Sequence, residues 1–227
     1  MSEEVSEGLP IFPLSTVLFP GVTLPLHIFE DRYRSLVSTL LAQPEGEARV
    51  FGIVAIREGY EVGSRGVHSV QRVGCSAQLT SVEPYDDGRF DIEVVGRRRI
   101  RIDALDTGGE FLVGEVAWLD EPVGEGTEEA VARARRTFEA YRVRLLEASG
   151  KDITPPDDLP TDASALSYSL AAACLLTQLD RQALLEADDA TSRLRLATSM
   201  MRAEMRAIRA LPSLPATEVA RTGWSPN

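Results

Sequence analysis

Two dense apolar segments open the chain within residues 9–29, one on each side of a Pro20-Gly21 turn. Both faces of each segment are apolar, which is typical of strands covered on both sides. From Glu30 onward, large apolar side chains recur every three or four residues as far as Leu41. That spacing indicates an amphipathic helix with one core-facing stripe. We therefore expect two short strands joined by the turn, followed directly by a helix.

The next seventy or so residues show a β pattern, in which glycine-containing turns separate apolar and alternating segments. Residues 90–94 alternate between apolar and acidic side chains, as a strand with one buried face does. Glycines at 74, 96 and 114 fall inside long strand-like segments and indicate the bulges or corners that close a small barrel. The expected strands are residues 49–56, 68–85, 89–96, 97–105 and 110–119.

Helical spacing dominates the second half of the chain, after a linker that begins at about residue 120. The expected helices are residues 127–148, 165–176, 180–186 and 191–211. We thus predict an α+β protein: a barrel-like β domain with one helix at 9–120, and an all-α helical bundle at 121–211. Residues 1–8 and 212–227 lack periodicity, so we expect both ends to be disordered.

The formal net charge of −11 narrows the range of partners. It disfavours nucleic acid and anionic membrane surfaces, because both require neutralisation of phosphates. No apolar run approaches the ~18 residues that span a bilayer, and the acidic N-terminus lacks the apolar core of a secretory signal. Cys75 and Cys174 are far apart and are expected to be reduced and buried. We expect a cytoplasmic protein.

Residues that would support catalysis or metal binding are sparse. The sequence contains no GxxxxGK[ST] phosphate loop, no GxSxG and no HExxH. Its single lysine, Lys151, lies in a proline-rich linker, which disfavours a Ser-Lys nucleophile. The histidines His27 and His68 and the two separated cysteines form no metal-ligand pattern. We therefore expect no catalytic residues, no metal and no cofactor, and predict that the chain is not an enzyme.

Several short segments together resemble the LON substrate-binding domain, the N-terminal domain of ATP-dependent Lon proteases. They are LPIFPL (9–14), FPG (19–21), PLHIFE (25–30), RYR (32–34), VGCSAQL (73–79), GRRRIRI (96–102) and RQALLEADD (181–189). The resemblance implies a PUA-like barrel followed by a helical part, and a domain that recognises polypeptide substrates. The sequence shows no counterpart of the ATPase and protease modules, so we expect a stand-alone form without proteolytic activity.

The first four of these segments, within residues 9–34, supply the candidate substrate-binding residues. Their aromatic side chains would hold unfolded segments if they are partly exposed, with packing in the core as the alternative for each. His27 is either a ligand contact or a structural histidine that bonds a loop. Glu30 and Arg32 either grip a bound chain or belong to a helix start with a Glu30–Arg34 ion pair. The candidates are Phe12, Phe19, His27, Phe29, Glu30 and Arg32.

The leading hypothesis is a non-catalytic module that binds unfolded or extended polypeptides, with a role in protein quality control or proteolysis. We expect a monomer or weak homo-oligomer, and no nucleic-acid or membrane partner. A groove at a domain junction or an exposed sheet edge would be the natural site. Three alternatives stay open: a PUA-like nucleic-acid binder, a regulatory partner of a separate ATP-dependent protease, and a hydrolase that uses His27.

Overall fold

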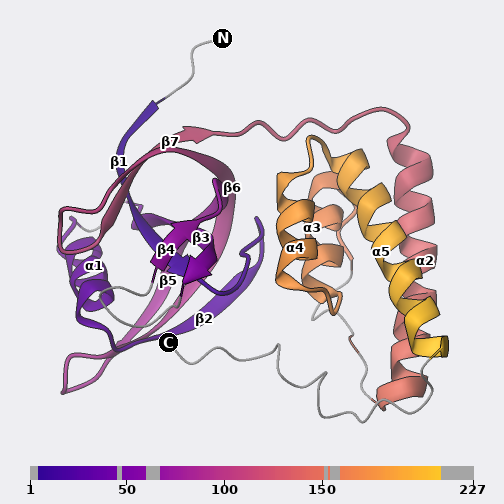
Figure 1. Ribbon diagram of the computed structural model, residues 1–227, viewed down its shortest axis with the longest axis horizontal. Helices are drawn as coiled ribbons and strands as arrows, with labels where there is room; N and C mark the ends of the chain where they lie inside the picture. The colour runs from indigo at the N-terminus through magenta and orange to yellow at the C-terminus, as the bar shows by residue number, and fades with distance from the viewer. Residues whose placement is uncertain (1–4, 45–47, 60–66, 151–152, 154–158, 211–227) are drawn as a thin grey trace. The chain divides into compact units, whose positions relative to one another are not determined.

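The computed structural model describes residues 5–44, 48–59, 67–150, 153 and 159–210 (Figure 1). The chain divides into two compact units, of which the first ends at Asp120 and the second begins at Glu121. The predicted disordered tail at 212–227 lies outside the described residues, as do residues 1–4 and the proline-rich segment 155–158.

In the part of the first unit that the structure describes, the chain forms one mostly antiparallel sheet and one helix. The sheet follows the order β1-β7-β6-β5-β3-β4, and β2 pairs with β6 beside this path. Since β1 also pairs in parallel with β3, the strand pairings from β1 through β7, β6, β5 and β3 return to β1 (Figure 1). The strands are β1 (Val5–Leu14), β2 (Thr23–Ile28), β3 (Val50–Gly59), β4 (Val67–Val70), β5 (Val73–Pro84), β6 (Phe90–Asp106) and β7 (Leu112–Trp118).

The first strand departs from the prediction in two ways. It begins at Val5, inside the stretch 1–8 that was expected to be disordered, because Val5 pairs with Ala117 of β7. A register shift follows at Gly8, whose φ of +51° is a conformation that glycine adopts without strain. Among the described residues, β1 and β2 do not pair with each other. The Pro20-Gly21 turn thus leads from one region of the sheet to another.

Gly96 is the point where this turn docks on the sheet. The Gly21 N–H donates to the Gly96 carbonyl oxygen at 2.8 Å, and the Gly96 N–H donates to the Val22 oxygen at 3.0 Å. A Cβ atom at position 96 would lie 2.2 Å from the carbonyl oxygen of Phe19. The strand β6 therefore passes continuously through Gly96, where the sequence suggested two separate segments, and the missing side chain makes room for the turn.

Helix α1 (Asp31–Leu41) packs its apolar stripe into an apolar cluster of this unit that also contains Phe12 and Phe51. The stripe of Tyr33, Leu36, Val37 and Leu40 is at most 3% exposed. The Phe12 ring stacks on Tyr33 with 3.9 Å between ring centroids. Helix and sheet are thus joined by a continuous apolar core, as the three- and four-residue spacing predicts.

The described residues of the second unit form four helices: α2 (Thr127–Ser149), α3 (Ala163–Ala173), α4 (Gln178–Glu186) and α5 (Ala190–Ala210). The side chains of Asp162 and Thr177 accept hydrogen bonds from backbone N–H groups in the first turns of α3 and α4, so these two helices have side-chain N-caps. Helix α3 ends at Ala173, three residues before the predicted end. The Cys174 backbone is extended (ψ 144°), which ends the helix there.

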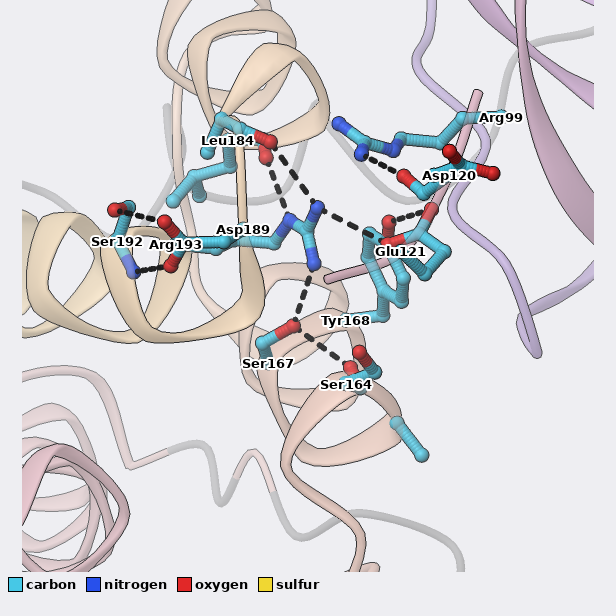
Figure 2. Close-up of polar contacts among 12 residues, drawn as sticks. Arg99, Asp120, Glu121, Ser164, Ser167, Tyr168, Leu184, Asp189, Ser192 and Arg193 are labelled. Atoms are coloured by element: carbon cyan, nitrogen blue, oxygen red, sulfur yellow. Dashed lines mark hydrogen bonds and ion pairs between the residues drawn. The ribbon is translucent and has the colours of Figure 1, made fainter. Parts of the chain in front are cut away.

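A buried arginine connects three parts of this unit (Figure 2). Arg193, on α5, is fully buried, and its Nε donates to the Leu184 oxygen of α4 at 2.9 Å. Its Nη1 donates to Ser167 of α3 at 3.0 Å, and its Nη2 lies 3.5 Å from a carboxylate oxygen of Glu121. The Tyr168 ring lies 3.9 Å from the guanidinium carbon. The buried charge of Arg193 is tolerated because oxygen acceptors receive its N–H groups and the Glu121 carboxylate balances its positive charge.

Candidate functional site

Two of the six candidate binding residues lie in the core. Phe12 and Phe19 are 0% exposed, so of the two alternatives left open for these residues, packing in the core is the one the structure shows. Besides stacking on Tyr33, the Phe12 ring lies 6.1 Å from that of Phe51. The backbone of Phe19 packs directly against Gly96. Both side chains serve the core of the first unit and are out of reach of a ligand from solvent.

The other aromatic candidate lies with His27 in a partly exposed group of side chains where β2 ends. His27 Nδ1 lies 2.6 Å from Asp91 Oδ1, and the Tyr85 hydroxyl donates to Asp91 Oδ2 at 2.5 Å. The ring centroids of Phe29 and Tyr85 lie 6.2 and 6.0 Å from that of His27. The Arg89 guanidinium lies 5.6 Å from the Tyr85 ring. We call His27, Phe29, Tyr85, Arg89 and Asp91 the His27 cluster.

The electrostatics of the cluster fix the orientation of the imidazole. The Tyr85 hydroxyl, and after it His27, lower the pKa of Asp91, and the bond to Asp91 raises the pKa of Tyr85. Asp91 is therefore an ionised acceptor, so His27 donates from Nδ1 and presents Nε2. Among the described residues, no hydroxyl or thiol bonds His27. The arrangement suits a fixed hydrogen-bonding surface between two aromatic rings better than nucleophilic catalysis.

Glu30 and Arg32 lie at the start of α1 and bind each other. Glu30 Oε2 and Arg32 Nη2 are 3.2 Å apart, with side chains only 12% and 20% exposed. The Arg32 guanidinium also lies 4.4 Å from the Tyr33 ring centroid. The expected Glu30–Arg34 pair is replaced, because Arg34 binds Asp31 and donates to the Gly88 oxygen at 2.7 Å. The two candidates thus have little surface to offer a ligand.

One edge of β2 is open to an additional strand. The Gly96 N–H donates to the Val22 oxygen, so residue 22 directs its backbone groups toward β6. Because this direction alternates along an antiparallel strand, residues 24, 26 and 28 also face β6. Residues 23, 25 and 27 therefore direct their backbone groups away from β6. Pro25, opposite Glu93, agrees with this, because a proline without an N–H is tolerated on an outer edge. No described residue bonds these outward groups.

Sequence reasoning missed Tyr85, Arg89 and Asp91, which come from the β5–β6 hairpin about sixty residues after His27. Pro25, which has no N–H to donate to a neighbouring strand, was the available signal for an edge. Within the described residues, no group of three His, Cys, Asp or Glu side chains can hold a metal ion. No helix in the same part of the chain is long and apolar enough to cross a bilayer.

Within the described residues, a mostly antiparallel sheet with one helix precedes a unit of four helices, and this arrangement defines the fold class. Two solved structures share this fold: the Lon N-terminal domain protein from Xanthomonas campestris (TM-score 0.61) and the N-terminal domain of Mycobacterium avium complex Lon protease (TM-score 0.60). Each is 24% identical and aligns with 86% of this chain and 98% of its own.

The sequence comparison identifies the family. The profile of the ATP-dependent protease La (LON) substrate-binding domain matches residues 8–203, so the chain belongs to this family. The Lon proteases of Escherichia coli K12 and Erwinia amylovora are 29% and 28% identical over 210 residues, or 90% of this chain. Those residues make up 26% of each Lon protease, so the chain spans about a quarter of the length of these relatives.

Proposed function

We propose that this chain is a non-catalytic polypeptide-recognition module, in which an extended segment of a client protein pairs with the outer edge of β2. Membership of a substrate-binding domain family supports the class of function. The observation that carries the site is the set of backbone groups at residues 23, 25 and 27, which no described residue bonds.

The edge suits a ligand of variable sequence. Two N–H groups, of Thr23 and His27, and three carbonyl oxygens face outward, and all five bind backbone regardless of the side chains of the client. Five bonds at about 0.5–1.5 kcal/mol net each total about 2.5–7.5 kcal/mol before the entropy of ordering the client is subtracted, so backbone pairing alone should give a dissociation constant of roughly millimolar or weaker. Weak, sequence-tolerant binding is what a module that must release its clients requires.

The His27 cluster makes the β2 edge prefer certain side chains of the client. Phe29 and Tyr85 flank the imidazole at the end of the same strand, so an apolar or aromatic client residue there would bury surface against two rings. His27 Nε2, with Nδ1 bonded to Asp91, is available to a polar group of the client. His27 thus contributes to binding, and we assign it no hydrolytic role.

Finer aspects of the function are proposed on the same basis. The relatives are named Lon protease, and this chain matches the portion that corresponds to substrate binding. We propose that any ATP hydrolysis and peptide cleavage that follow recognition occur in other protein modules. The closed circuit of strand pairings in the first unit further supports a PUA-like barrel as the scaffold of the edge.

The experiment is a matched pair of substitutions at the first residue of β2. Thr23→Pro removes an outward N–H at a position where a strand accepts proline, whereas Thr23→Ala removes only the side chain. Binding of a fluorescent, permanently unfolded carboxymethylated protein is measured by anisotropy. We expect Thr23→Pro to weaken binding several-fold and Thr23→Ala to leave it nearly unchanged. Equal affinities of wild type and Thr23→Pro, with both folded by circular dichroism, would reject the edge as the site.

A further inference from the structure

The second unit carries a concentration of positive charge in a chain that is otherwise strongly acidic. A groove of about 480 Å³ lies between α2 and α5, which run side by side (Figure 1). Four arginines and a single acidic residue, Glu129, are among its lining side chains. A second hollow of about 470 Å³ shares Arg133 and Arg202 with the first and adds Arg136. The arginines are Arg133, Arg136, Arg195, Arg202 and Arg206.

The groove follows from the sizes of the side chains where the two helices meet. Its floor consists of small residues such as Ala130 and Thr198, which are 5% and 4% exposed. The Thr198 hydroxyl donates to the Leu194 oxygen of its own helix, so it does not compete for a ligand. Long arginine side chains rise on both sides of this floor. The result is a channel with a neutral base and cationic walls.

Three of the five guanidinium groups are available for a ligand. Arg136, Arg202 and Arg206 make no hydrogen bond or ion pair with any described residue. Arg133 is paired with Glu129 one turn earlier, and Arg195 donates to the Glu125 carbonyl oxygen. Like charges brought together without acidic partners repel one another, and an anionic ligand relieves that repulsion.

We propose that this groove, which we call the α2–α5 groove, binds an acidic segment of a partner polypeptide. Arg195, Arg202 and Arg206 are spaced seven and four residues apart along α5, or about 10 and 6 Å. Alternate side chains of an extended chain recur every ~7 Å, so carboxylates at every second or third residue match the arginines. The inference is independent of the β2 edge, because all its residues belong to the second unit.

A peptide fits the α2–α5 groove better than a nucleic acid does. No aromatic side chain is among its lining residues, so bases would find nothing on which to stack. A long polyanion also experiences the net charge of −11 that the whole chain carries. A short acidic segment responds chiefly to charges within a Debye length, about 8–10 Å, and the charged residues that line the groove are arginines apart from Glu129.

The test measures binding of a fluorescent decapeptide of alternating Glu and Ser by anisotropy at low salt. The double variant Arg202→Gln/Arg206→Gln removes two unpaired arginines from the groove. Arg57→Gln/Arg97→Gln is the control, because it removes the same charge from exposed strand positions of the first unit. We expect the groove variant to bind roughly tenfold more weakly, the control to bind within about twofold of wild type, and salt to abolish the difference.

Three results would overturn the inference: equal affinity of the groove variant and wild type, equal binding of a Gln-Ser peptide, or tighter arginine-dependent binding of single-stranded RNA. Circular dichroism of each variant establishes that it is folded. Thr23→Pro is measured with the same acidic peptide and should bind normally. Failure of the groove is thereby distinguished from failure of the β2 edge.

Discussion

Arg193 offers the sharpest test of how the helical unit is held together. The side chain is fully buried and donates to Leu184 at 2.9 Å and to Ser167 at 3.0 Å. It also lies 3.5 Å from Glu121 and stacks on Tyr168. The substitution Arg193→Met keeps most of the length and apolar stem but removes the charge and all donors. It leaves the Leu184 carbonyl and the Glu121 carboxylate without this partner.

The expected loss is large because the arginine is buried. Breaking a buried charge network by removing one partner costs about 3–5 kcal/mol. Glu121 is 29% exposed, so water can compensate part of its loss, and the lower end, about 3 kcal/mol, applies. With a urea dependence of about 1–1.5 kcal/mol per M for a unit of this size, the midpoint should fall by about 2–3 M.

The assay follows the unfolding of each unit with its own probe. Circular dichroism at 222 nm in urea follows mainly the helices of the second unit. Fluorescence of Trp118, in a Trp224→Phe background, follows the first unit, where Trp118 ends β7. Arg193→Met should shift the helical transition and leave the Trp118 transition in place, and exposed Arg133→Met should shift neither. A helical midpoint that moves by less than about 0.5 M would refute the account of Arg193.

Further predictions concern the first unit and the thiols. Gly96→Ala should lower the free energy of unfolding by about 3 kcal/mol, since its Cβ would meet the Phe19 oxygen at 2.2 Å; an unchanged melting temperature would contradict this. Burial raises the pKa of Cys174 to about 12, so Ellman's reagent should modify that thiol at pH 8 only after unfolding; rapid reaction of the native protein would be the opposite result. Tyr85→Phe should raise the pKa of Asp91 toward its ordinary value, as measured by carbon-13 NMR. Because a lowered carboxyl pKa adds stability that disappears as pH falls through it, Tyr85→Phe should lose less stability than wild type below about pH 4; equal acid sensitivity would argue against the bond.

Local periodicity predicted the helices well, because the three- and four-residue spacing of apolar side chains that defines α1 or α2 is complete within a few helical turns. It could not determine which apolar strand residues face solvent, since a segment that is apolar on both faces has no polar side to mark. Phe12 and Phe19 were therefore candidates until the parallel pairing of β1 with β3 and the docking at Gly96 placed them in the core.

Long-range pairing explains the misses at the candidate site. His27 is positioned by Asp91, 64 residues later, and no local rule links the two. The i,i+4 rule suggested a Glu30–Arg34 pair, but Arg34 instead donates to Gly88 at the β5–β6 turn. The β2 edge was closest to being predictable, because Pro25 cannot donate to a neighbouring strand on its outer side.

Hydrogen exchange of individual amides, followed by NMR with and without an unfolded client, tests the proposed recognition edge most directly. In the free protein, we expect the outward N–H groups of Thr23 and His27 to exchange quickly and the inward ones of Leu24 and Leu26 to exchange slowly. Client binding should slow exchange at Thr23 and His27 and leave the inward pair as it was. Unchanged rapid exchange at Thr23 and His27 under saturating client would contradict pairing at the β2 edge.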